Sequence, residues 1–79
     1  PADTEANLNA SCVALRQADI TRAGSYLKRA GQPPAAINAR GVLALLQGHL
    51  AQAQQLFEQA AANGSDEAKR NLTLITAAN

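Results

Sequence analysis

The sequence predicts an all-α fold in which five helices form about two and a half helix-turn-helix units within a single domain, residues 1–79. Apolar residues recur at spacings of three and four along five segments, and glycine, proline or capping residues divide these segments. The chain also aligns with itself after a shift of thirty residues. Aromatic residues make up only 3%, which argues against a β-sandwich because strands favour aromatic and β-branched side chains. A generic helical bundle is the structural alternative.

The first two helices are expected over residues 4–17 and 20–30. Asp3 is placed to cap the first helix and Asp19 to cap the second, because an aspartate oxygen can accept from a free backbone N–H of the first turn. The apolar positions are Leu8, Cys12 and Leu15 in the first helix and Ile20, Ala23, Tyr26, Leu27 and Ala30 in the second.

The third and fourth helices are expected over residues 34–47 and 50–62. Gly31 suits the left-handed position after a helix, and Pro33-Pro34 prevents continuation and starts the third helix with proline. Gly48-His49 marks the turn between the third and fourth helices. The apolar positions are Ile37, Gly41, Ala44 and Leu45 in the third helix and Leu50, Ala53, Leu56, Phe57 and Ala60 in the fourth.

A fifth helix is expected after Asn63-Gly64, which ends the fourth. Ser65 is its predicted cap, and Asp66 and Glu67 in its first turn suit the positive end of the helix dipole. Its buried side is predicted to carry Leu72 and Ile75.

The internal match places small residues on small ones and large residues on large ones. The corresponding pairs are Ser11/Gly41, Cys12/Val42, Ala14/Ala44, Leu15/Leu45, Gln17/Gln47, Ala18/Gly48, Ile20/Leu50, Ala23/Ala53, Leu27/Phe57 and Ala30/Ala60. Stacked helix pairs require such agreement, because each unit buries its apolar face only against its neighbours.

The second unit has a small residue in its first helix, a turn that contains glycine, and then alanine, an aromatic residue and alanine in its second helix. These residues are Gly41, Leu45-Leu46-Gln47-Gly48, Ala53, Phe57 and Ala60, and the first unit matches through Ser11, Ala18-Asp19, Ala23, Leu27 and Ala30. The pattern resembles the tetratricopeptide repeat (TPR) family over nearly the whole chain. The resemblance implies antiparallel helix-turn-helix repeats stacked as a short right-handed solenoid.

By this resemblance, unit one covers about residues 4–31, unit two about 34–63, and a terminal or capping helix about 66–78. The resemblance assigns helix packing to Ser11, Ala23, Leu27, Ala30, Gly41, Ala53, Phe57 and Ala60. The chain departs from the family in several respects, and the proline that commonly ends a unit is shifted or absent. The units are about 30 and 32 residues long instead of 34, and Arg40 stands where leucine is typical.

In TPR arrays the first helix of each pair lines a concave groove, so the resemblance also implies where a partner binds. The corresponding residues here are Leu8, Asn9, Cys12, Leu15, Arg16, Asn38, Val42, Leu45, Leu46, Arg70, Asn71 and Leu74. Such a mainly aliphatic surface with a few amide and guanidinium groups suits an apolar peptide or an amphipathic helix. Alternatively, the aliphatic members pack on one another or under the terminal helix.

Some TPR modules grip a carboxylate with lysine and asparagine side chains at fixed groove positions. The corresponding positions here hold Leu8, Cys12, Ala35 and Ala39. None of them carries the required lysine or asparagine, so the comparison with those modules predicts that the clamp is absent.

Two residues with reactive side chains are predicted to be structural. No histidine or lysine lies near Cys12 in sequence to activate its thiol, so we expect a small buried hydrophobic residue. His49 lies in a turn without a second ligand at metal-binding spacing, so no metal site is expected. The sequence also contains no phosphate loop, nucleophile motif or converging carboxylates, and it therefore predicts no enzyme, no catalytic residue and no cofactor.

Charge and hydropathy exclude further classes. The net charge is +1, and its seven basic and six acidic residues form no basic stripe for a nucleic-acid backbone. No apolar run approaches the roughly 20 residues of a membrane span. The first residues lack the features of a signal peptide, so we expect either that no signal exists or that the chain is a processed or excised piece.

The sequence thus predicts a non-catalytic protein–protein interaction module, a scaffold or adaptor that binds a peptide or helix and is a fragment of a larger protein. The alternatives are a small helical nucleic-acid-binding domain, a purely structural helical spacer, and an enzyme or cofactor-binding bundle. The chain also resembles short alanine- and asparagine-rich TPR segments of bacterial cell-envelope proteins. That resemblance suggests the periplasm or cell envelope but leaves the cytoplasm, the partner and the oligomeric state open.

Overall fold

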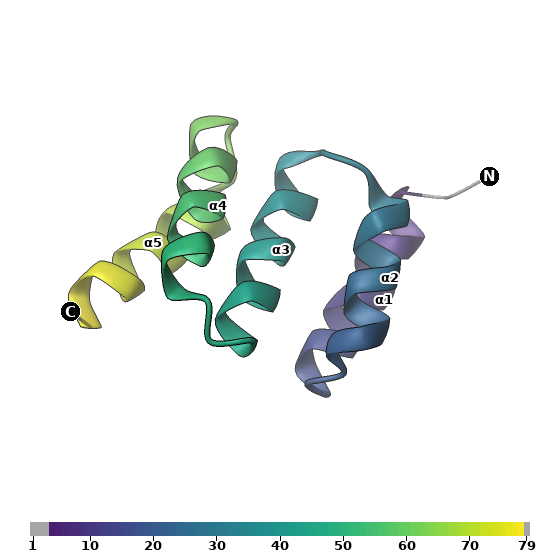
Figure 1. Ribbon diagram of the computed structural model, residues 1–79. Helices are drawn as coiled ribbons and strands as arrows, with labels where there is room; N and C mark the ends of the chain where they lie inside the picture. The colour runs from purple at the N-terminus through teal and green to yellow at the C-terminus, as the bar shows by residue number, and fades with distance from the viewer. Residues whose placement is uncertain (1–3, 79) are drawn as a thin grey trace.

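The computed structural model describes residues 4–78, which form five α-helices joined by short turns (Figure 1). The helices are α1 (Thr4–Arg16), α2 (Ile20–Ala30), α3 (Pro34–Leu46), α4 (Leu50–Ala62) and α5 (Asp66–Ala78). The predicted all-α class is confirmed, with helix ends that agree to within one residue, and no strand occurs in this range. Asp3, the predicted cap of the first helix, lies outside the described residues.

The helices stack in chain order. Each helix packs against the next one, and α3 also contacts α1. Figure 1 shows α3 and α4 standing beside α1 and α2, while α5 runs obliquely across α4. The Cα atoms extend over 39 × 25 × 16 Å, so the molecule is elongated along the direction of stacking. This arrangement of neighbouring helices is repeat-like.

Local signals explain where three of the helices begin. The Asp19 carboxylate accepts a hydrogen bond from the backbone N–H of Arg22 at 3.2 Å and thereby caps α2. The Ser65 hydroxyl oxygen accepts from the backbone N–H of Ala68 at 3.1 Å and caps α5. Helix α3 begins at Pro34, whose missing N–H would have no partner in the first turn. Both predicted caps and the proline start are therefore confirmed.

The turns between the helices of the two pairs have the same geometry but different residues. Ala18 has a φ of 56° and Gly48, at the corresponding position, a φ of 81°. In each turn the next backbone N–H donates to the carbonyl of an alanine in the preceding helix, at 2.8 Å to Ala14 and at 2.9 Å to Ala44. Because glycine adopts this left-handed conformation freely and alanine does not, the first turn carries backbone strain that the second avoids.

The core combines many alanines with a few large side chains. Phe57 and Leu27 are the largest fully buried side chains. All eight residues expected at packing positions are buried: Ser11, Ala23, Leu27, Ala30, Gly41, Ala53, Phe57 and Ala60. Alanine at these positions lets helix axes approach closely, and the large residues fill the remaining space.

The contact between Gly41 and Phe57 is the tightest packing feature around a glycine. A Cβ atom added to Gly41 would lie 2.5 Å from Cε1 and 2.7 Å from Cδ1 of the Phe57 ring. In the first pair, Ser11 takes the place of Gly41 and Leu27 that of Phe57; Ser11 is fully buried, and its hydroxyl donates to the Leu8 carbonyl at 2.7 Å. The first pair thus has a larger residue at the small position, serine instead of glycine, and a smaller residue at the large position, leucine instead of phenylalanine.

Arg40 joins the two helix pairs. Its Nη2 donates to the backbone carbonyl of Leu27 at 2.6 Å and to that of Gly31 at 2.7 Å. These carbonyls lie at the C-terminal end of α2, where a positive charge also interacts favourably with the helix dipole. The arginine at this position, where leucine was the expected residue type, therefore makes a polar contact between α3 and the end of α2.

Two residues of the apolar faces expected from the sequence are largely exposed. Leu45 is 38% exposed and Leu50 is 45% exposed. They flank the turn between α3 and α4, at the end of the hairpin, where helix packing stops. None of the helices in residues 4–78 is long and apolar enough to cross a membrane.

Candidate functional site

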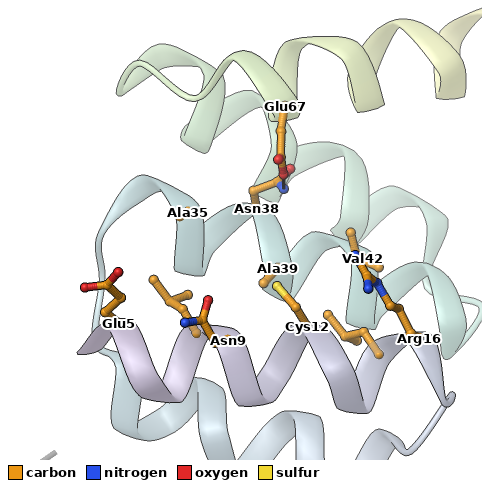
Figure 2. A pocket seen from close by; sticks show the side chains of 11 residues that line it. Glu5, Asn9, Cys12, Arg16, Ala35, Asn38, Ala39, Val42 and Glu67 are labelled. Carbon is orange, nitrogen blue, oxygen red and sulfur yellow. Dashed lines mark hydrogen bonds between the residues drawn. The ribbon is translucent and has the colours of Figure 1, made fainter. Parts of the chain in front are cut away.

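A groove of about 430 Å³ lies between α1 and α3, with the first turn of α5 on its rim (Figure 2). It is lined by Glu5, Leu8, Asn9, Cys12, Leu15, Arg16, Ala35, Asn38, Ala39, Val42 and Glu67. These residues come from three helices, and those of α1 follow one stripe along the helix at spacings of three and four. We refer to this set as the α1–α3 groove.

The structure brings together seven of the twelve residues expected to bind a partner. They are Leu8, Asn9, Cys12, Leu15, Arg16, Asn38 and Val42. Leu45 and Leu46 do not line the groove and are exposed at the end of α3. Arg70 and Leu74 lie on a different hollow, and Asn71 contacts the groove only through Asn38.

Four lining residues were not among those expected. Glu5 lies one turn before Asn9 on the same stripe of α1, so extending the helical spacing would have found it. Ala35 and Ala39 had been considered only as positions that lack a carboxylate clamp. Glu67 was explained in the sequence by the dipole of its own helix, and nothing in the sequence shows that it also faces α3.

The floor of the groove is apolar, and Cys12 lies exposed on it. Figure 2 shows Cys12 and Ala39 facing each other from α1 and α3. The prediction that Cys12 is buried is therefore wrong. The small side chain of Ala39 leaves the space that the thiol faces.

A buried asparagine connects the groove to α5. Asn38 is only 5% exposed, and its Nδ2 donates to Oε2 of Glu67 at 3.4 Å. Its Oδ1 accepts a hydrogen bond from Nδ2 of Asn71 at 3.0 Å. A buried amide needs such partners because an unpaired one loses its hydrogen bonds to water. The bond from Asn71 orients the Asn38 amide, which in turn donates to the Glu67 side chain at the rim of the groove.

The charged groups of the groove form no ion pair within residues 4–78. The ion pairs in residues 4–78 join Arg22 to Asp19 at 3.6 Å and Lys69 to Asp66 at 3.7 Å, both outside the groove. Figure 2 shows Glu5 and Arg16 at opposite ends of α1, with Glu67 on the opposite rim. The rim thus carries two carboxylates and one guanidinium that are not neutralised by an ion pair in the described part of the chain.

A second hollow, of about 410 Å³, lies on the outer surface of α5. It is lined by Lys69, Arg70, Thr73 and Leu74, and Leu74 is 67% exposed. Because all four residues come from one helix, the hollow has no opposing wall among the described residues. The α1–α3 groove, with walls from separate helices, is the better candidate site.

Other chemistry is not assembled around the groove. The single histidine of the sequence, His49, is exposed and precedes α4, outside the groove. The described part of the chain holds no group of three or more histidine, cysteine, aspartate or glutamate residues that could bind a metal ion. Cys12 has no neighbouring base among the lining residues of the groove. The arrangement offers apolar contact, amide hydrogen bonds and ion pairing.

No protein-family model, curated protein or solved structure significantly matches this chain.

Proposed function

We propose that this chain is a TPR-like, non-catalytic protein–protein interaction module whose α1–α3 groove binds a peptide segment of another protein. The observation that carries the proposal is the groove itself: an apolar floor between two helices, bordered by charged groups that form no ion pair among the described residues. An apolar concavity with a few placed polar groups is the usual form of a ligand site. The TPR resemblance of the sequence agrees with binding on this face.

The length of the groove suits a short peptide segment. From Glu5 to Arg16, α1 rises about 16 Å at 1.5 Å per residue, which an extended chain covers with about five residues. An extended segment can place alternate side chains on the floor along this whole length.

The side chains that line the groove disfavour the binding of a nucleic acid. Two of its three ionised side chains are carboxylates, Glu5 and Glu67, which repel a phosphate backbone. The groove also has no aromatic residue on which a base could stack. A peptide can place apolar side chains on the floor of the groove and charged side chains at its rim.

Cys12 provides a direct test because it is the single cysteine of the sequence and is exposed in the groove. A random twelve-residue peptide library displayed on phage is selected on the unmodified protein and on protein alkylated at Cys12 with a bulky maleimide. We expect peptides that bind the unmodified protein and lose binding when the groove is filled. Peptides that bind both forms equally would contradict the proposal.

The matched control moves the thiol to another helix. In the double variant Cys12→Ser/Gln55→Cys, the maleimide is attached to the exposed surface of α4, outside the groove. We expect the selected peptides to bind this alkylated variant as well as they bind the unmodified protein. Circular dichroism of each form checks that alkylation leaves the helices intact.

A further inference from the structure

We infer that the peptide bound in the α1–α3 groove carries a basic side chain that pairs with Glu67, next to aliphatic side chains that contact the groove floor. This inference rests on the proposed function and specifies the chemistry of the partner. It starts from the position of Glu67, which lies in the first turn of α5 and lines a groove formed otherwise by α1 and α3.

Glu67 is exposed, but one hydrogen bond connects its carboxylate to the packed interior. Its Oε2 accepts a hydrogen bond from Nδ2 of Asn38, and Asn38 is in turn held by Asn71. Asn38 is 95% buried, since its exposed fraction is 5%, so the amide that orients the carboxylate belongs to the packed interior. A carboxylate that is already ordered loses less conformational entropy when it binds a cation than a free surface side chain does.

The carboxylate of Glu67 is also unneutralised. Lys69, two residues later on α5, pairs with Asp66 instead, at 3.7 Å. The other groove carboxylate, Glu5, forms no ion pair within residues 4–78. The hydrogen bond from Asn38 uses Oε2, so Oε1 can accept a hydrogen bond from a bound cation. The charge complementarity of the groove therefore calls for a lysine or arginine on the peptide.

Arg16, the third charged side chain of the groove, predicts a second feature of the peptide. Arg16 lies at the end of the groove opposite Glu5 (Figure 2). A second basic residue of the peptide is disfavoured beside Arg16, because like charges repel, and is favoured beside Glu5, because opposite charges attract. Between these ends, Leu8, Cys12 and Val42 offer apolar surface to aliphatic side chains. The expected peptide is thus basic and aliphatic, with an acidic or neutral residue at the Arg16 end.

The decisive variant is Glu67→Gln, which removes the charge but keeps an oxygen that can accept from Asn38. Its matched control is Glu58→Gln, the same change on the exposed surface of α4, outside the groove. The probe is the most enriched groove-dependent peptide from the phage library, together with a version in which its basic residue is replaced by methionine. Affinities are measured by calorimetry, and thermal unfolding checks that each variant is folded.

We expect Glu67→Gln to weaken the basic peptide by about three- to fivefold, as for loss of a partly exposed ion pair. The methionine peptide should bind the wild type and Glu67→Gln equally, and Glu58→Gln should change neither affinity. A purely structural role of Glu67 predicts no difference between the two peptides.

Three results would overturn the inference. If the groove-dependent peptides lack basic residues, or if Glu67→Gln binds the basic peptide as tightly as the wild type does, the inference fails while the proposed function stands. If every selected peptide binds the protein alkylated at Cys12 as tightly as it binds the unmodified protein, the proposed function fails and the inference fails with it.

Discussion

The contact between Gly41 and Phe57 yields the sharpest prediction about stability. In Gly41→Ala the new Cβ would lie 2.5 Å from Cε1 of a phenylalanine ring that is fully buried and therefore cannot move into solvent. In the control Gly24→Ala, in the interior of α2, the nearest atom is Cδ2 of Leu43 at 4.0 Å, an ordinary van der Waals distance. The same chemical change thus meets a clash at one site and free space at the other.

The magnitudes follow from two opposing effects. Alanine is favoured over glycine by about 1 kcal/mol inside a helix, and this gain is common to both variants. Overpacking of a buried site costs typically about 1–3 kcal/mol. We therefore expect Gly24→Ala to raise the free energy of unfolding by up to about 1 kcal/mol, while Gly41→Ala lowers it by up to about 2 kcal/mol. The difference between the two variants isolates the clash.

The assay is equilibrium unfolding in urea, followed by circular dichroism at a wavelength that reports helix. If both variants shift the midpoint in the same direction by similar amounts, the close approach of Gly41 to Phe57 is not present in solution and the packing argument is refuted. The first helix pair suggests an internal rescue, because Ser11 and Leu27 occupy the corresponding positions. The double variant Gly41→Ser/Phe57→Leu should therefore lose less stability than the sum of its two single changes.

Three further predictions concern strain, the joint between pairs and the polar link to α5, each measured by the same urea titration. Ala18→Gly should stabilise by up to about 1 kcal/mol because it relieves a positive φ of 56°; no gain would show that the turn is unstrained. Arg40→Met should cost about 1–2 kcal/mol, since two carbonyls at the end of α2 lose their donor; the exposed Arg29→Met is the control. Asn38→Ala should cost about 1–3 kcal/mol, because it leaves the Asn71 amide unpaired; a neutral change would contradict the importance of this link.

The sequence predicts the helices well because their ends depend on local chemistry. An aspartate or serine cap, a proline in the first turn and a glycine after the last each act within a few residues of the position that they fix. The structure places Asp19, Pro34 and Ser65 in these roles. The all-α class follows directly from the same signals.

The groove is less predictable because it depends on the spaces between helices. Helical spacing alone finds the stripe of α1 but does not show that Ala39 leaves room in front of Cys12. Likewise, Leu45 continues the pattern of its helix but lies beyond the end of the packed region. Glu67 reaches the rim only because α5 crosses α4 at an angle set by tertiary packing.

The two hydrogen bonds of Arg40 have a consequence for how the chain connects its parts. Residues 31–33 form the covalent connection between α2 and α3, and Arg40 forms a second, non-covalent connection across the same joint. The orientation of the two pairs is therefore held by a side chain as well as by the backbone. A few residues inserted after Gln32 would lengthen the backbone connection and leave the side-chain connection in place, so the length of this loop is free to vary without undocking the pairs.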